Sequence, residues 1–303
     1  MERLVKGYGK LLLFGEHSAV YAYPAIGVPL PYGITLKGRV HRNSQNRRIN
    51  GENAFLDNLT QSISSITKNL NEPGYTIDVK SDLPVSRGFG SSAALCTALT
   101  KFFFPGLELS QCWDMAHKLE ARFHGRPSGI DTGLSLAHDL SWFHFSPNKE
   151  LPELYSSNRK LGIWIVPGSV PRQVSTKEIV LNIQQKIKEK HKKTIGLIET
   201  LGRITDQTIQ MTKGIIDFSA WSKLTIQAHD SLKELELYND ELTEVFKIAR
   251  TLGNPPGKLS GAGKGGAFYF VFPEKDKAMD FYRQLIAICE KKYHWTLFSP
   301  LAI

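Results

Sequence analysis

The sequence contains few cysteines and no long apolar segment. Its three cysteines, Cys96, Cys112 and Cys289, show neither the close spacing of a metal site nor a paired pattern, which argues against a disulfide framework. No stretch approaches the roughly 18 uninterrupted apolar residues of a membrane-spanning helix. The run LLLF at residues 11–14 is too short for the apolar core of a signal peptide. We therefore expect a cytoplasmic, disulfide-free protein.

Two common nucleotide-binding patterns are also missing. The Walker A pattern of P-loop proteins does not occur in the chain. The segment GAGKGG at residues 261–266 matches G-x-G-x-x-G, but it precedes the apolar run AFYFVF at 267–272. A dinucleotide-binding loop follows a strand and opens a helix, so this match is rejected. A bound nucleoside triphosphate would require another design.

Basic residues exceed acidic ones, with a formal net charge of +9 that suits an anionic ligand without identifying one. The densest basic segment, KIKEKHKK at 186–193, lies within a helical apolar pattern that runs from Ile179 to Ile198. It has neither interleaved aromatic residues nor a known docking motif. The pattern favours a solvated helix face, with nucleic-acid binding as a weak alternative.

The order of predicted elements indicates an α+β protein with two domains. Hydrophobic content of 41% and charged content of 22% are ordinary for a globular chain. The first half contains predicted strands at 10–14, 33–40 and 75–79 and a helix at 110–123. A polar, irregular stretch at 146–160 separates the halves. We place the domains at residues 1–158 and 159–303.

The second half begins with a predicted strand at 161–166 and is mainly helical to about residue 252. A glycine-rich segment, the strand 267–272 and a final helix follow. The regular strand–helix alternation of a doubly wound sheet is absent, and so are fixed-period repeats.

The segment PVSRGFGSSAA at residues 84–94 is the clearest candidate for phosphate binding. Its proline and glycines predict a loop, and the apolar residues after it recur at helical spacing. Ser91 or Ser92 is placed to cap this helix. A helix N-terminus with closely approaching glycines offers free N–H groups to an anion. An ordinary capped loop is the alternative.

Three charged residues are candidates for chemistry, each with an ordinary structural alternative. Asp131 follows a Pro-Ser-Gly turn, where it could accept a proton or simply cap the next helix. Glu120 borders the apolar face of its helix, where a carboxylate needs a cation or donors, although solvated helix glutamates are common. Lys10 begins a strand, where lysines usually maintain solubility.

Three ordered segments resemble the motifs of the GHMP small-molecule kinases. They are GKLLLFGEHSAVYAYPAIG (9–27), PVSRGFGSSAA (84–94) and KLSGAGKGGAF (258–268). Within that family, the first segment and HGRPSGID (124–131) are most similar to the compact, prokaryotic mevalonate kinases. Three positions depart from the family pattern: Lys264 and Ala22 where glycine is usual, and Arg87 where a small residue is common.

The resemblance implies the fold and the reaction. The implied fold is a two-domain GHMP kinase fold, whose N-terminal domain has a left-handed βαβ unit and whose C-terminal domain is a helix-rich ferredoxin-like sandwich. The implied activity is ATP-dependent phosphorylation of the 5-hydroxyl of mevalonate in isoprenoid precursor synthesis. The alternatives are a kinase for phosphomevalonate, homoserine or a sugar, and a catalytically silent sensor.

The resemblance also assigns roles to individual residues. Asp131 and Lys10 are the implied catalytic pair, and Ser92 and Glu120 are the implied Mg²⁺ ligands. The residues implied for ATP binding are Pro84, Gly88, Gly90, Ser91, Ser92, Ala93, Gly261 and Gly263. Those implied for the acceptor are Glu16, His17, Thr176, Gly261 and Ala262. The expected partners are a small-molecule substrate and a second copy in a homodimer, with neither nucleic acid nor membrane.

Overall fold

The computed structural model describes residues 2–41, 46–51, 62–64, 66, 73–124, 127–146 and 149–303. The chain divides into two compact units. Unit 1 comprises Met1–Lys10, Pro29–Val85 and Phe89–His138. Unit 2 comprises Leu11–Val28, Ser86–Gly88 and Asp139–Ile303. The predicted boundary between residues 158 and 159 stays a prediction.

Unit 1 is built on a sheet formed by strand β2 (Ala25–His41), β4 (Gly74–Ser81) and β3 (Arg47–Asn50). The second half of β2 pairs with β4 in antiparallel register, from Ile34 opposite Ser81 to His41 opposite Gly74. Strand β3 pairs with β4 in parallel. The connection between β3 and β4 lies largely outside the described residues, so the left-handed βαβ unit stays a prediction.

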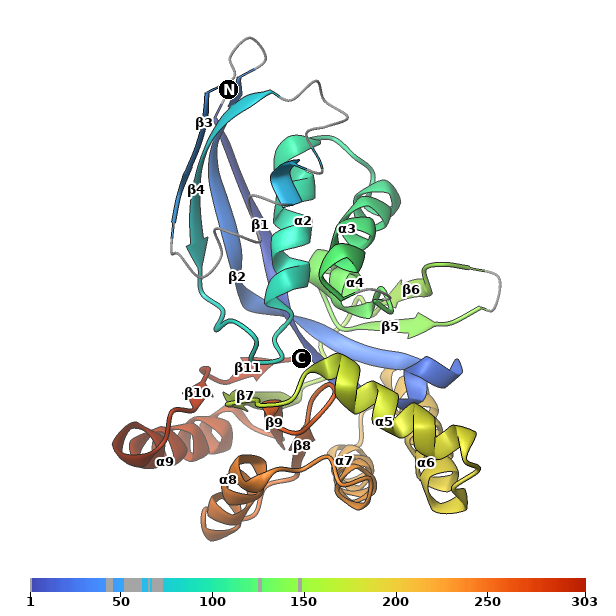
Figure 1. The fold of residues 1–303 in the computed structure, drawn as a ribbon. Coiled ribbons are helices and arrows are strands. Elements are labelled where there is room, and N and C mark those ends of the chain that lie inside the picture. The colour runs from blue at the N-terminus through green and yellow to red at the C-terminus, as the bar shows by residue number, and fades with distance from the viewer. Residues whose placement is uncertain are drawn as a thin grey trace. The chain divides into compact units, whose positions relative to one another are not determined.

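Three helices lie together on one face of these strands: α2 (Ser91–Phe103), α3 (Leu109–His124) and α4 (Ile130–Leu136) (Figure 1). Helix α2 is buried on nearly all sides from Ala93 onward. It approaches strand β1 (Arg3–Phe14) at Gly7, where an added Cβ would lie 1.9 Å from the Ala94 carbonyl oxygen. Only glycine allows this backbone contact, which fixes the start of α2 beside β1.

Unit 2 contains the short 3-10 helix η1 (Ser18–Tyr21) and a hairpin of β5 (Ser141–His144) and β6 (Glu153–Ser156). Strand β5 of this hairpin also pairs with Ala25–Gly27 of β2. The second sheet of unit 2 has the order β10-β7-β9-β8. The strands are β7 (Trp164–Val170), β8 (Gly257–Leu259), β9 (Gly266–Phe272), β10 (Thr296–Leu297) and β11 (Leu301–Ala302), the last paired with β7.

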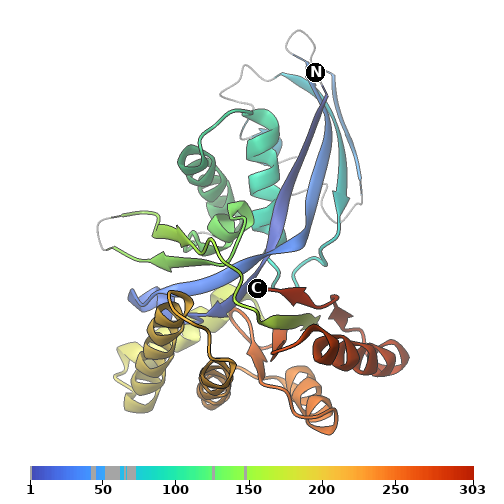
Figure 2. The ribbon, with the colours of Figure 1, turned by 180° about the vertical axis from the view of Figure 1, so that it is seen from behind.

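The helices of unit 2 are α5 (Thr176–Lys188), α6 (Lys192–Thr212), α7 (Phe218–Glu234), α8 (Asp240–Thr251) and α9 (Lys275–Lys292). Helices α7, α8 and α9 cover one face of the sheet (Figure 2). Phe270 of β9 packs against Phe246 of α8 and Phe281 of α9 at ring distances of 5.0 and 4.9 Å. Along the chain, unit 2 has a strand (β7), helices, two strands (β8 and β9), a helix (α9) and a strand (β10), and the paired strands β10-β7-β9-β8 are antiparallel. This arrangement confirms the predicted ferredoxin-like sandwich.

Most predicted elements are confirmed, with shifted limits. The strands expected at 10–14 and 33–40 extend to Arg3–Phe14 and Ala25–His41, and the one expected at 161–166 is Trp164–Val170. The continuous helical pattern expected from Ile179 to Ile198 was wrong, because α5 ends at Lys188 and Lys190 has a φ of 55°. The basic segment lies at this break and is mostly exposed, as expected for a solvated face. Among the described residues, no helix is long and apolar enough to cross a bilayer.

Candidate active site

In unit 1, Lys10 lies in the buried middle of β1, with only 6% of its side chain exposed. Its backbone N–H donates to the Phe89 carbonyl oxygen at 2.9 Å. An added Cβ at Gly90 would lie 2.8 Å from Lys10 Cγ, so the loop before α2 passes directly over the lysine stem. The Lys10 ammonium lies 3.0 Å from Oδ1 of Asp131. The structure therefore brings together the two residues predicted to be catalytic.

Asp131 lies in the first turn of α4, directly after the turn that the sequence predicted. Gly129 begins this helix with a φ of 81°, a conformation that favours glycine. The indole of Trp113 donates to the Gly129 carbonyl oxygen at 3.1 Å and to Thr132 Oγ1 at 3.2 Å, which holds the turn in place. The Asp131 side chain is 40% exposed, so its carboxylate has an open side available to a ligand.

Glu120 of α3 and Ser92 of α2 form a second contact in the same unit. Ser92 Oγ donates to Glu120 Oε1 at 3.4 Å, and Glu120 is only 2% exposed. Burial, followed by the nearby charge of Asp131, raises the pKa of Glu120 to about 8, against the opposing effects of Lys10 and Ser92. Its other oxygen, Oε2, is buried without a hydrogen-bond partner among the described residues. The opposing charge of Lys10 therefore does not offset the effects of burial and of Asp131 on this carboxylate.

A magnesium ion fits this arrangement. A serine hydroxyl and a carboxylate with an unsatisfied oxygen are hard donors, and Mg²⁺ usually takes one or two protein ligands and keeps several waters. In the part of the chain that the structure describes, no three His, Cys, Asp or Glu side chains cluster in a way that could hold a metal. The site is therefore suited to a metal that arrives with phosphate oxygens and water, rather than to an all-protein metal cage.

The N-terminus of α2 exposes backbone donors at the predicted phosphate loop. Helix α2 begins at Ser91, and Gly90 occupies the N-cap position with a φ of 72° and no side-chain cap. The prediction that Ser91 or Ser92 caps the helix was wrong, because both serines lie within its first turn. The N–H groups at the start of a helix have no partners inside the helix, so Ser91, Ser92 and Ala93 present donors suited to phosphate.

In unit 2, the Gly-Glu-His segment is joined to the third glycine-rich segment by side chains. Glu16 forms a fully buried ion pair with Lys258, a residue whose role the sequence interpretation missed. His17 Nε2 lies 2.9 Å from the Ala262 carbonyl oxygen. Burial lowers the pKa of His17, partly offset by this hydrogen bond, so the ring is neutral near pH 7.

Two glycines of the third segment, Gly261 and Gly263, have φ angles of 87° and 90°. An added Cβ at Gly263 would lie 2.7 Å from the Leu237 carbonyl oxygen, whereas Gly261 faces open space within 4 Å. The backbone N–H of Lys264 donates to the same Leu237 oxygen at 2.7 Å. The turn between α7 and α8 therefore supports the loop from one side.

Thr176 is the first residue of α5, and Ser175 is the N-cap residue, whose side chain accepts from the Glu178 N–H. Arg172 donates to Thr176 Oγ1 at 2.8 Å. An added Cβ at Gly266 would lie 2.4 Å from Arg172 Nη2, and one at Gly88 would lie 3.5 Å from it. The Arg172 guanidinium therefore lies beside Gly88 of the phosphate loop, Gly266 of the third glycine-rich segment and Thr176. Local sequence patterns do not reveal that these three meet at one arginine.

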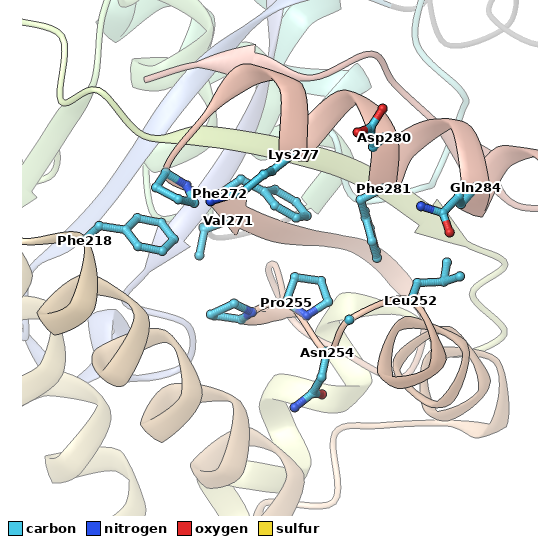
Figure 3. A pocket seen from close by; sticks show the side chains of 13 residues that line it. Phe218, Leu252, Asn254, Pro255, Val271, Phe272, Lys277, Asp280, Phe281 and Gln284 are labelled. Atoms are coloured by element: carbon cyan, nitrogen blue, oxygen red, sulfur yellow. The ribbon is translucent and has the colours of Figure 1, made fainter.

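A separate cavity of about 370 Å³ lies in unit 2 between the end of α8, strand β9 and helix α9 (Figure 3). Phe218, Phe272 and Phe281 form its apolar part, and Lys277 and Asp280 lie at its rim. It contains none of the residues predicted for ATP, metal or acceptor binding.

Two family models match this chain. The model for the N-terminal domain of GHMP kinases matches residues 57–137, and the model for the C-terminal domain matches residues 211–291. Together these matches cover just over half of the chain. The first match includes Ser92, Glu120 and Asp131, and the second includes the third glycine-rich segment.

Curated relatives and solved structures agree with these models. The mevalonate kinase of Thermococcus onnurineus is 28% identical over 91% of this chain and 90% of its own length. That of Pyrococcus furiosus is 27% identical over 91% of both chains. The structure of L. major mevalonate kinase in complex with R-mevalonate gives a TM-score of 0.82 at 20% identity, covering 99% of this chain and 97% of that one. Lactococcus lactis galactokinase complexed with galactose gives 0.75 at 16% identity, covering 99% and 93%. These structures share the fold.

Proposed function

This chain belongs to the GHMP kinase family and is an ATP-dependent small-molecule kinase, and we propose that its acceptor is the 5-hydroxyl of mevalonate. Curated relatives that match about nine-tenths of its length are named mevalonate kinases, which supports this acceptor over others in the family. The single observation that carries the chemistry is the contact between Lys10 and Asp131, beside the buried Glu120.

The proposed reaction forms a bond between the acceptor oxygen and the γ-phosphorus of ATP and breaks the bond from that phosphorus to the bridging oxygen of ADP. Asp131 orients the acceptor hydroxyl and receives its proton, for which its 40% exposure leaves room. The Lys10 ammonium holds the Asp131 carboxylate in place at 3.0 Å and stabilises negative charge that develops on the acceptor oxygen. The product is a phosphate monoester, with ADP as the leaving group.

The residues around the ATP phosphates have distinct roles in this proposal. The N–H groups of Ser91, Ser92 and Ala93 at the start of α2 bind phosphate oxygens, with Pro84, Gly88 and Gly90 shaping the loop before them. Glu120 and Ser92 hold Mg²⁺, which neutralises phosphate charge when bound. Gly261 and Gly263 provide open backbone for the phosphates, as the empty space beside Gly261 permits.

The proposed acceptor residues are His17, Thr176, Gly261 and Ala262. Glu16, predicted with them, has a fully buried side chain and would support this group from behind His17 without touching the acceptor. His17 is neutral and has a fixed orientation, which suits hydrogen bonding to a hydroxyl more than binding an anion by charge. The hydroxyl of Thr176 accepts from Arg172 and still has a proton to donate. The cytoplasmic location and the homodimer stay predictions.

An ATP-consumption assay with purified protein and Mg²⁺ tests the proposal. The acceptor panel should contain mevalonate, phosphomevalonate, homoserine and galactose at equal concentrations. We expect the highest kcat/KM with mevalonate and a phosphate ester detectable by ³¹P NMR. A clear preference for another acceptor would overturn the substrate while leaving the kinase assignment intact. Binding of ATP without turnover on any acceptor would favour a silent sensor.

A further inference from the structure

The buried ion pair between Glu16 and Lys258 in unit 2 is not required by the proposed phosphoryl transfer. Neither side chain has any exposed surface. The Lys258 ammonium also donates to the Leu259 carbonyl oxygen at 2.9 Å, and it lies 5.4 and 5.2 Å from the ring centroids of Phe14 and Tyr269. Removing two charges from water is costly, so a pair kept this deep is weak evidence for a stabilising role. Its location suggests another use.

The residue after Glu16 has a strained backbone. His17 has a φ of 60° and a ψ of −35°, and the Ser18 N–H donates across it to the Glu16 carbonyl oxygen at 2.6 Å. This is the rare γ-turn with positive φ, which costs roughly 1–3 kcal/mol for a residue other than glycine. Such a turn persists only where the surrounding structure holds it.

Two side-chain contacts hold the turn, one on each of its first two residues. Lys258 holds the Glu16 carboxylate, and the Ala262 carbonyl oxygen holds the His17 ring. Both partners come from the third glycine-rich segment, four residues apart. Because a carbonyl oxygen can only accept, Nε2 of His17 carries the proton, and Nδ1 is left as an acceptor. The ring therefore presents one defined acceptor atom.

We propose that Lys258 is a positioning residue for acceptor recognition: by fixing the Glu16 carboxylate, it keeps His17 in its strained turn with Nδ1 ready to accept a hydrogen bond from an acceptor hydroxyl. This inference rests on the proposed kinase activity toward a hydroxy acid. Its physical basis is that Lys258 supplies a buried positive charge in direct contact with the Glu16 carboxylate, and removing one partner of a buried ion pair is costly. The segment would then rearrange to reach water, and the His17 turn would relax.

The main test compares Lys258→Met with Tyr269→Phe. Lys258→Met removes the ammonium and keeps an unbranched apolar chain. Tyr269→Phe is the matched control, because it removes a hydrogen bond to the Leu13 carbonyl oxygen in the same buried region and leaves the ion pair intact. We expect Lys258→Met to raise the KM for mevalonate by about tenfold or more, with the KM for ATP changed less than about threefold. The control should leave both constants near the wild-type values.

A double variant separates positioning from stability. Glu16→Met with Lys258→Met leaves no unpaired buried charge, so this protein should fold at least as stably as Lys258→Met alone. If the pair positions His17, the KM for mevalonate stays raised in the double variant although stability recovers. If the KM returns to the wild-type value together with stability, the pair serves stability alone and the proposal is wrong.

NMR of ¹⁵N-labelled histidine reads the His17 ring without any turnover. The wild-type spectrum should show a proton on Nε2 and a ring whose pKa lies below the ordinary value of histidine, and His17→Gln assigns the signal. In Lys258→Met the signal should change toward mixed tautomers and ordinary titration, and in Tyr269→Phe it should not. An unchanged His17 signal in Lys258→Met would overturn the proposal. If wild-type protein fails to phosphorylate mevalonate, the proposed function fails, yet this spectrum still decides whether Lys258 positions His17.

Discussion

The ammonium of Lys10 lies 3.0 Å from the carboxylate of Asp131, and the two side chains differ in exposure, at 6% and 40%. The cation is held by the strand and by the Gly90 loop that crosses it. The anion stands at a helix start with one side open. This asymmetry suits a base that must meet an incoming hydroxyl, because the lysine fixes the carboxylate without covering it.

Asp131→Asn should lower kcat by about two to four orders of magnitude, the usual scale for losing a proton acceptor. The amide keeps the shape of the side chain but neither takes the proton nor pairs with Lys10. The KM for ATP should change little, and steady-state kinetics with both substrates varied would measure this. Asp139→Asn is a matched control, since Asp139 is 44% exposed and lies 3.9 Å from Lys160. Near-normal turnover in Asp131→Asn would remove this residue from the mechanism.

Glu120→Gln should lower turnover by at least about 100-fold while making the ligand-free protein more stable. The pKa of Glu120 rises on folding, so the folded state loses stability as pH rises from about 4.5 toward 8. The glutamine variant avoids this loss and should gain up to about 3 kcal/mol in the free energy of unfolding at pH 7.

Urea unfolding without Mg²⁺ would measure this gain, which should shrink as the pH falls and disappear below about pH 4, where the carboxyl is mostly protonated in both states. Glu199→Gln, on an exposed position of α6, serves as the control and should change neither turnover nor stability. A Glu120→Gln protein that is less stable at pH 7 would contradict the raised pKa of this buried carboxyl.

The sequence predicts well the local elements that carry the proposed catalytic group of unit 1, because its motifs are local. The turn before Asp131, the helix of Glu120 and the loop before α2 each follow from residues within a few positions. The helix cap was predicted wrongly because its cause is not local. Serine is a favoured cap, yet the close approach of Lys10, which is distant in the sequence, leaves room only for glycine at position 90.

The partner of Glu16 could not be predicted in the same way. Lys258 lies 242 residues away, and its position between Gly257 and Leu259 in a short strand resembles that of an ordinary strand lysine. Only the tertiary structure shows that both side chains are fully buried. The break between α5 and α6 was missed because Lys190 adopts a positive φ that lysine does not favour. The N–H groups of Lys190 and His191 donate there to the carbonyl oxygens of Ile187 and Lys186, which ends the helix.

The stability of the protein should fall between pH 6.5 and pH 4 in part because of His229. Burial, aided by the charges of Lys233, Arg250 and Lys258, lowers the pKa of His229 to about 4, and Tyr238 OH donates to its Nδ1 at 2.8 Å. Because the folded-state pKa lies below the unfolded one, the unfolded state binds the proton first as pH falls, and up to about 3 kcal/mol is lost.

His229→Gln keeps an acceptor for Tyr238 but does not titrate, so its free energy of unfolding should fall less steeply over this range. His17 contributes in the same direction, so the slope should decrease without vanishing. Chemical denaturation at half-unit pH steps would measure both slopes. His138→Gln, at an exposed position, should behave as wild type. Equal slopes in wild type and His229→Gln would show that this ring does not titrate with folding.

Lys264 stands in the third glycine-rich segment with a φ of 53°, in the left-handed region that favours glycine. Lys264→Gly should therefore raise the free energy of unfolding by about 0.5–1 kcal/mol. Lys190→Gly is a closely matched control, because Lys190 has a φ of 55° and lies outside the motif segments. Both variants should gain similar stability in urea unfolding.

The kinetics of these two variants decide whether the Lys264 ammonium takes part in the reaction. The pKa of Glu236 is lowered mainly by Lys186 and to a lesser degree by Lys264. The Lys264 ammonium therefore already interacts with an acidic side chain outside the loop. We expect Lys264→Gly to lower kcat/KM by at most about tenfold, or about 1.4 kcal/mol of transition-state stabilisation, and to keep the acceptor preference. Lys190→Gly should leave kcat/KM unchanged. If Lys264→Gly lowers kcat/KM as much as Asp131→Asn does, Lys264 is a catalytic cation, and Lys10 is not the main cation of the reaction.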